Sequence, residues 1–205
     1  LTPSVVLSLG LGLTLLVALA LVDGNLRREL TSSLPERAPN FFFVDIQKTE
    51  LDGFRSLLAA RSPAGQIEEV PMLRGRILAF NGTDVSKMEV PPAGRWVLRG
   101  DRGITYAETL PRNAQVTAGE WWPANYTGEP LVSFSAEEAA QLGLKVGDTV
   151  TVNVLGRSIT AKIANFREVD WESLSINFVM IFSPNTFAGA PHTWLATLTL
   201  PNATS

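Results

Sequence analysis

The sequence predicts an α+β fold in which strands dominate, preceded by one membrane-spanning helix. Three observations support this class: an uncharged apolar run from Ser4 to Val22, a strand–helix–strand order within residues 41–82, and an alternating hairpin pattern within residues 149–163.

The apolar run is the first element. Its nineteen positions carry no charge, and at about 1.5 Å of rise per residue they span close to the ~30 Å hydrocarbon core of a bilayer. Leu, Val and Ala occupy every face of such a helix, unlike the single stripe of a soluble amphipathic helix. A secretory signal peptide is the alternative, but the run exceeds the usual apolar region of such peptides. We therefore predict a membrane helix.

A stalk is expected to follow the membrane span. Leu26, Leu30 and Leu34 recur every four residues, and Pro35 ends the pattern. Residues 1–35 are accordingly predicted to form one transmembrane and stalk helix, with a short juxtamembrane linker as the alternative. Charges of both signs follow the span, so the positive-inside rule does not orient it.

Composition restricts the classes of function. The net charge is −3, 18% of the residues are charged and no block of Lys or Arg occurs, so nucleic acid is not an expected partner. The absence of cysteine excludes disulfides, thiolate metal sites and cysteine nucleophiles. The roughly 180 residues after the span suit one or two domains with a sizeable core.

Residues 36–82 are predicted to place a helix on a sheet. Phe41–Gln47 has the composition of a short strand, Thr49 is a candidate N-cap, and Pro63–Gly65 ends the helix. The apolar face of this helix would carry Leu51, Phe54 and Leu57 or Leu58. Ile67–Gly82 then predicts one or two further strands.

Residues 83–130 are irregular and rich in Gly, Pro and Asn, so we expect short strands or extended segments there. Downstream, Ser135–Glu138 has the pattern of a capping box that opens a short helix. Further strands are predicted over Ser175–Phe182 and Thr193–Leu200.

The hairpin is the clearest strand signal. We predict that Gly147 adopts a conformation that Ala would resist and that Gly156-Arg157 reverses the chain. Apolar residues alternate with polar ones on both sides of that reversal. The predicted buried face consists of Val150, Val152, Val154, Ile159, Ala161 and Ile163.

The motifs that carry chemistry are missing. The sequence has neither a phosphate-binding loop nor a dinucleotide fingerprint, and no G-x-S-x-G elbow accompanies the single histidine, His192. The candidate carboxylates are Glu137-Glu138 at a helix start, Glu168 with Asp170, and Asp101 with Glu108; nothing in the sequence fixes their separation. We therefore expect no enzyme activity and no catalytic, cofactor or metal site.

Tryptophans are the candidate contact residues. Trp121 and Trp122 are adjacent between turn residues, and in an extended backbone their side chains would point to opposite faces, one buried and one exposed. Trp121, Trp122 and Trp171 are the candidate residues for contact with a partner or a lipidic substrate, with one ring of the adjacent pair in that role. The alternative is that they cap the core of an irregular lobe.

Three segments together resemble a known family. They are Gly119–Trp122, the stretch Ser135–Ile163 with its L-G-L-x-x-G-D core, and Phe178–Pro184. With the preceding span they resemble the periplasmic insert of FtsX-like, MacB-type ABC transporter permeases, and Ala107–Asn113 favours the YbbP-like subgroup, which is linked to a lysophospholipase/thioesterase. The resemblance implies a MacB-like periplasmic domain with a βαβ porter-like lobe (36–82, with a return strand in 190–205) and a strand-rich lobe (83–189). Such inserts continue into a second β-α-β half, which we expect beyond this sequence.

The resemblance also implies a function. The chain would be the periplasmic part of a permease subunit in the bacterial inner membrane, coupling cytoplasmic ATP hydrolysis to extraction or handover of a hydrophobic envelope molecule. Implied partners are a separate cytoplasmic ABC ATPase, a second permease copy, membrane lipid and a periplasmic lysophospholipase/thioesterase. Two alternatives stay open: an interaction module that recruits and regulates a periplasmic hydrolase without transport, and a membrane-anchored enzyme. An apolar groove between lobes would favour transport, whereas a flat, aromatic-rimmed patch would favour recruitment.

Overall fold

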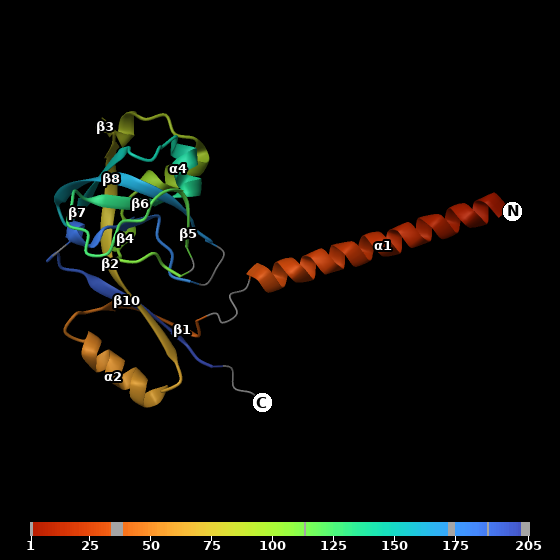
Figure 1. The fold of residues 1–205 in the computed structure, drawn as a ribbon, viewed down its shortest axis with the longest axis horizontal. Helices are drawn as coiled ribbons and strands as arrows, with labels where there is room; N and C mark the ends of the chain where they lie inside the picture. The colour runs from red at the N-terminus through yellow and green to blue at the C-terminus, as the bar shows by residue number, and fades with distance from the viewer. Residues whose placement is uncertain (1, 34–38, 113, 172–174, 188, 202–205) are drawn as a thin grey trace. The chain divides into compact units, whose positions relative to one another are not determined.

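The computed structural model describes residues 2–33, 39–112, 114–171, 175–187 and 189–201. The chain divides into two units, one built on helix α1 (Thr2–Ser33) and one that contains all the strands (Figure 1). Their relative placement is not determined, so each unit is described by itself. Both the apolar helix and the mixed α+β class agree with the sequence prediction.

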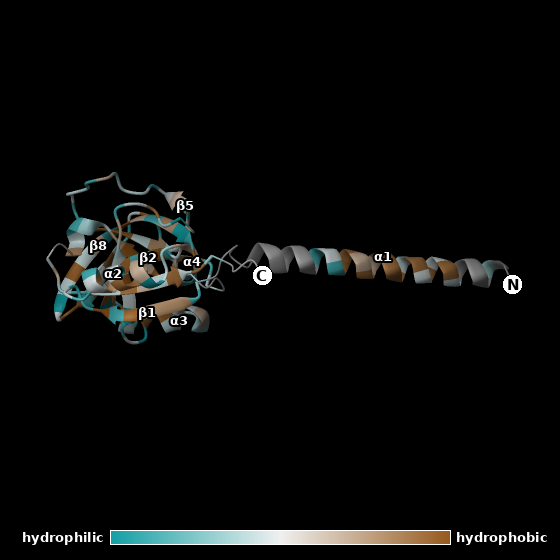
Figure 2. Ribbon diagram, turned by 90° about the horizontal axis from the view of Figure 1, so that it is seen from below, coloured by the Kyte–Doolittle hydropathy of each residue, from teal (hydrophilic) through white to brown (hydrophobic). Residues whose placement is uncertain are grey.

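Helix α1 is continuous and apolar on every side of its central part, as the hydropathy colouring shows (Figure 2). Ser8–Asn25 is long and apolar enough to cross a membrane, a property that signal sequences share. The hydroxyl of Thr14 is satisfied locally, since its Oγ1 donates to the Gly10 carbonyl at 2.8 Å. Helix α1 continues to Ser33, so the helix extends beyond the apolar run, as predicted; Leu34 and Pro35 lie outside the described residues.

A three-stranded sheet with one helix forms the first part of the second unit. Strand β10 (Thr193–Thr199) lies between β1 (Phe41–Ile46) and the first half of β2 (Gln66–Phe80), antiparallel to both. Helix α2 (Leu51–Arg61) packs on this sheet. The contacts between them are made by Ile46, Leu51, Ala196, Phe43, Phe54 and Trp194. The predicted strand–helix–strand order is confirmed.

One detail of this region, the N-cap of α2, differs from the prediction. The N-cap of α2 is Glu50 rather than Thr49, because Thr49 lies inside a turn closed by the hydrogen bond from the Glu50 N–H to the Gln47 carbonyl (2.9 Å). The segment expected to hold one or two strands is the single 15-residue strand β2. Its first half pairs with β10 and its second half with β4 and β7, so the two parts of the unit share one strand.

The second half of β2 closes a barrel. Following the hydrogen-bonded neighbours leads from β2 through β4, β9, β6, β8 and β7 back to β2. The pairs β4/β9 and β6/β8 are parallel and the other pairs are antiparallel. The remaining barrel strands are β4 (Arg102–Tyr106), β6 (Leu131–Ser135), β7 (Thr149–Val154), β8 (Arg157–Glu168) and β9 (Met180–Phe182). The ring of strands surrounds the main apolar core.

Several shorter elements are attached to the barrel. Strand β5 (Gln115–Gly119) pairs with β8, and β3 (Thr83–Asp84) pairs with β2. The expected short elements within residues 83–130 are therefore confirmed. The helical pieces are α3 (Arg95–Leu98), α4 (Ala136–Leu142) and the 3-10 turns η1 (Val85–Lys87), η2 (Pro92–Gly94) and η3 (Pro184–Phe187).

The predicted hairpin is confirmed. Strands β7 and β8 pair with Val152 opposite Ile159; five of the six predicted apolar residues are buried, and Ile159 packs half-buried against the core. Gly147 has φ 98°, as its turn requires. The reversal is made by Leu155 and Gly156, with φ 52° and 81°, rather than by Gly156-Arg157, because both central residues of a two-residue turn of this hand need positive φ.

The predictions for the capping box and for the strand over 175–182 are only partly right. Ser135 does precede α4, but its side chain makes no capping bond and its Oγ is buried without a partner. Strand β9 covers only Met180–Phe182. Before it, the carbonyls of Phe178 and Val179 accept hydrogen bonds from the guanidinium of Arg167.

Candidate functional site

A groove lies where the three-stranded sheet meets the barrel. It consists of two hollows of about 530 Å³ and 500 Å³ that share Tyr106, the last residue of β4, and Pro184, the first of η3. We call them together the junction groove. Its other main lining residues are Pro71, Ala107, Glu108, Asn125, Tyr126, Asn185 and Trp194 in the first hollow, and Gln47, Lys48, Phe187, Pro191 and His192 in the second.

A row of rings separates the two hollows. Tyr106 and His192 meet edge to face with centroids 5.5 Å apart, and His192 lies 5.4 Å from Trp194. His192 Nδ1 is 2.9 Å from the Ala190 carbonyl, which can only accept, so Nδ1 carries the proton and Nε2 accepts from the Tyr106 hydroxyl at 3.3 Å. Partial burial raises the pKa of Tyr106, which keeps this hydroxyl a donor.

Two polar atoms in the groove wall are unsatisfied within the described residues. Trp194 Nε1 and Asn185 Oδ1 are buried without a hydrogen-bond partner, whereas Asn185 Nδ2 donates to the Gly128 carbonyl at 2.6 Å. An unpaired buried donor or acceptor costs about 1–3 kcal/mol, so such atoms often mark places where water or a ligand completes the structure.

The predicted tryptophan pair, Trp121 and Trp122, holds two residues of the groove wall in place through hydrogen bonds. Trp122 is 4% exposed and its Nε1 donates to the Ala107 carbonyl at 2.9 Å, while Trp121 is half-buried and donates to the Glu108 carbonyl at 3.0 Å. The expectation that the rings point to opposite faces is wrong: they stack with centroids 4.1 Å apart, because this segment is not a strand. The pair thereby fixes the backbone of two residues that line the groove.

Gly119 explains why the tryptophan segment lies where it does. It ends β5 with φ 76°, and a Cβ on it would collide with the Ala164 carbonyl on the neighbouring strand β8. The close approach is locked by Asn165, whose Nδ2 donates to the Glu120 carbonyl at 3.0 Å. Only glycine permits both the positive φ and this contact.

Trp171 belongs to a separate aromatic cluster. It is 38% exposed and meets Trp96, 39% exposed, edge to face at 5.8 Å. The guanidinium carbon of Arg102 lies 5.0 Å from the centre of the Trp96 ring, within the range of a cation–π contact. This exposed Trp96–Trp171 pair is the second place at which predicted contact residues occur.

Two of the candidate carboxylates, Asp101 and Glu108, each bind a different partner. Asp101 is bound to Arg76 at 3.1 Å, and Glu108 accepts from the Asn125 N–H at 3.0 Å. Both nitrogens of His192 are already occupied. Within the described ranges, no group of three or more His, Asp and Glu side chains is arranged to hold a metal ion.

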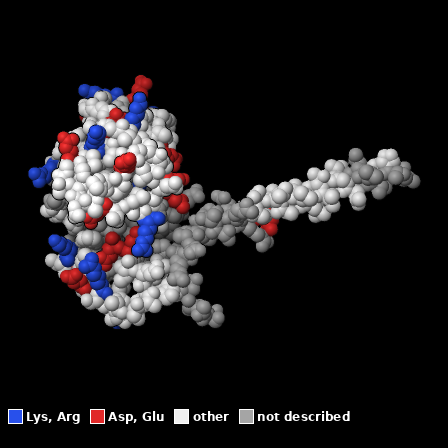
Figure 3. All heavy atoms as spheres, in the orientation of Figure 1, with Lys and Arg blue, Asp and Glu red and all other residues white. Residues whose placement is uncertain are grey.

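Sequence reasoning missed the main residues of the groove, Tyr106, Asn185 and Trp194. Their strands and turn are far apart in the chain, and no local pattern distinguishes them from core aromatics. The face seen in Figure 3 shows acidic and basic residues interspersed over the second unit, without a field of one sign.

Comparison with known proteins identifies a relative. No model of a known protein family matches the chain. The chain is 29% identical over 192 residues to "Uncharacterized ABC transporter permease YbbP" of Escherichia coli (strain K12), which covers 94% of the chain and 23% of that protein. It thus spans about a quarter of the length of this relative. The chain is therefore homologous to a segment of an ABC transporter permease of the YbbP type.

Proposed function

We propose that this chain provides a membrane helix and a periplasmic domain of an ABC permease subunit in the bacterial inner membrane. The subunit couples ATP hydrolysis by a separate cytoplasmic ATPase to extraction or handover of a hydrophobic envelope molecule. Homology over 94% of the chain supports the permease assignment. In this proposal, the domain is MacB-like, with a porter-like lobe (36–82 and 190–205) and a strand-rich lobe (83–189).

The junction groove is the observation that carries the transport proposal. Its hollows of about 530 and 500 Å³ lie within the range of small-molecule sites, roughly 300–1,000 Å³. Aromatic and proline side chains dominate the first hollow, and a few polar atoms interrupt them. In this proposal, Trp121 and Trp122 act by holding the wall of the groove, and a hydrophobic molecule passes along Tyr106 and Trp194.

The Trp96–Trp171 pair favours a second candidate function. Two large side chains, each more than a third exposed, with Arg102 beside them, suit contact with a protein. This surface would recruit and regulate a periplasmic hydrolase, such as a lysophospholipase/thioesterase, without transport. A second permease copy is the other partner that we propose for the subunit.

Transmission through α1 distinguishes the two functions. A continuous helix moves as one body, so a displacement in the membrane would reach the periplasmic domain. Inserting Gly-Gly after Arg28 costs about 2 kcal/mol of helix stability and creates a hinge. In the full-length permease reconstituted with its ATPase, we expect retained ATPase binding and a loss of ATP-dependent transfer of a fluorescent hydrophobic probe from the bilayer.

The matched control is an Ala-Ala insertion at the same point, which lengthens the helix equally without a hinge. It should keep more transfer activity than the Gly-Gly insertion. If the Gly-Gly variant transferred the probe at the rate of the unaltered permease, transmission through α1 would be refuted and passive recruitment would be the better account.

A further inference from the structure

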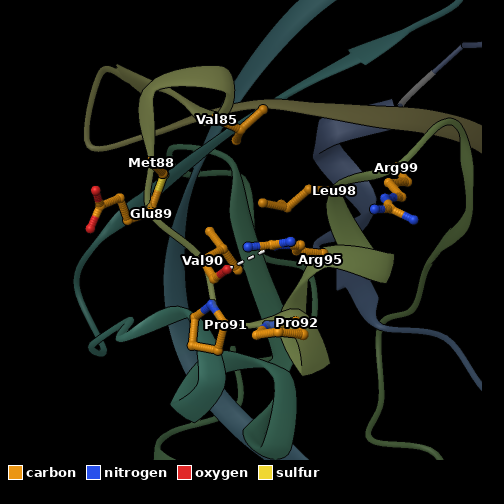
Figure 4. Close-up of a pocket in the computed structure, with 9 residues that line it drawn as sticks. All are labelled: Val85, Met88, Glu89, Val90, Pro91, Pro92, Arg95, Leu98 and Arg99. Atoms are coloured by element: carbon orange, nitrogen blue, oxygen red, sulfur yellow. Dashed lines mark hydrogen bonds between the residues drawn. The ribbon is translucent and has the colours of Figure 1, made fainter.

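A second hollow, outside the junction groove, lies on the barrel unit. The chain between β2 and β4 folds into η1, η2 and α3, and beside these elements lies an open hollow of about 740 Å³ (Figure 4). Four apolar side chains line it: Val85, Met88, Val90 and Leu98. Val90 is a buried member of the barrel core and the other three pack against that core, so the hollow has a firm apolar floor.

Two arginines face the same space. Arg95 Nε donates to the Val90 carbonyl at 3.0 Å, which anchors the side chain and leaves its terminal nitrogens for other partners. Arg99 also lines the hollow. Within the part of the chain that the structure describes, neither guanidinium forms an ion pair, in contrast to Arg55 and Arg76.

The one acidic lining residue does not neutralise these arginines. Figure 4 shows the Glu89 carboxylate directed away from both Arg95 and Arg99. The hollow therefore combines an apolar floor with two unpaired positive charges. This combination complements a molecule that has an apolar body and an anionic end.

We propose that this arginine hollow binds a single-chain anionic amphiphile, an apolar chain that ends in a carboxylate or a phosphate. Guanidinium groups bind both anions through paired hydrogen bonds. The volume lies within the range of small-molecule sites, roughly 300–1,000 Å³. Binding here needs neither the ATPase nor transport, so it stands apart from the proposed function.

Methionine methyl groups give a local readout of binding. The chain has three methionines: Met88 lines the hollow, Met180 is fully buried in the core, and Met72 lies on β2. With ¹³C-methyl methionine in the whole chain, held in phosphatidylcholine nanodiscs, we expect decanoate and decyl phosphate to shift the Met88 signal saturably. The Met180 signal should not move. Decanol and decyltrimethylammonium, with the same chain, should bind at least about tenfold more weakly.

The double variant Arg95→Gln/Arg99→Gln tests the charges. It should lower the affinity for decanoate at least about tenfold, while Arg157→Gln, an exposed arginine at the start of β8, leaves it unchanged. An unaltered Met180 signal verifies folding. A response to decyl phosphate alone supports the site and assigns it to phosphates. Decanol binding as tightly as decanoate, a double variant that binds normally, or a Met88 shift caused only by an acidic peptide would each overturn the proposal.

Discussion

At the scale of single residues, Arg167 has the largest structural role. It is 2% exposed, and its guanidinium donates to the carbonyls of Ser133 (2.8 Å), Val179 (3.3 Å) and Phe178. Burial lowers the pKa of Arg167 to about 9, and the nearby Glu138 carboxylate opposes that shift. One side chain thus joins β6 to the segment before β9.

Replacing Arg167 should be severely destabilising. Arg167→Met leaves three carbonyls without this donor and Glu138 without its nearby cation, so we expect a loss of about 3 kcal/mol in the free energy of unfolding. Urea denaturation of the whole chain in detergent, followed by tryptophan fluorescence, measures it. Arg74→Met, at an exposed arginine on β2, is the control and should stay within about 0.5 kcal/mol of the unaltered chain. An equal effect of the two substitutions would contradict this role.

Trp122 should contribute more to the free energy of unfolding than Trp121. Trp122→Ala removes a buried ring and its bond to Ala107, so a loss of about 3–5 kcal/mol is expected. Trp121→Ala, at a half-buried ring, should cost clearly less. The same urea denaturation compares them. A larger loss for Trp121 would show that the stacked pair is held mainly by its outer member.

At the scale of elements, tight turns and close contacts between backbone segments determine the register of the strands and the path of the chain after them. The two-residue turn at Leu155 and Gly156 sets the register of β7 against β8, and that register puts their apolar residues on the core face. Gly119 determines the path of the chain at the end of β5. Because it has no side chain, the backbone passes close to β8 before it enters the tryptophan segment.

Two glycines with similar φ should respond differently to alanine. Gly119→Ala adds a Cβ that collides with the Ala164 carbonyl, whereas nothing lies within 4 Å of a Cβ at Gly156. Both pay the cost of positive φ, about 1–2 kcal/mol. We therefore expect Gly156→Ala to lose about that amount and Gly119→Ala clearly more. Thermal unfolding by circular dichroism measures both, and equal losses would show that β8 moves aside without strain.

At the scale of the whole molecule, the apolar helix and the strand-rich unit follow different physical rules. The central side chains of α1 are exposed and apolar all round, which suits lipid, while the second unit buries its apolar residues inside a ring of strands. The chain therefore combines an exposed apolar helix long enough to cross a membrane with a unit that has its own core.

A charge in the middle of α1 should impair membrane integration. Leu15→Arg places a guanidinium near the centre of the span, which costs about 2.5–3.5 kcal/mol on insertion scales. Asn25→Arg, at the end of the span, is the matched control because its side chain can reach the interface. Alkaline carbonate extraction of membranes should release the first variant and retain the second. Full retention of Leu15→Arg would argue against a spanning helix.

The sequence by itself determined the elements whose signals are local. The uncharged run predicts α1, the valine alternation predicts the β7–β8 hairpin, and the strand–helix–strand order predicts β1, α2 and β2. In each case the pattern of neighbouring residues and the turn chemistry suffice, because periodicity records which face of an element is buried.

Only the tertiary structure decided which distant segments meet. The closure of the barrel, the parallel β4/β9 and β6/β8 pairs and the meeting of Tyr106 with Trp194 at the junction groove join residues far apart in the chain. The stacked tryptophans and the carbonyls bound by Arg167 likewise depend on neighbours that no local pattern specifies. Burial and hydrogen bonding are satisfied over the whole unit at once, so a residue such as Arg167 acquires its role only when the strands around it are in place.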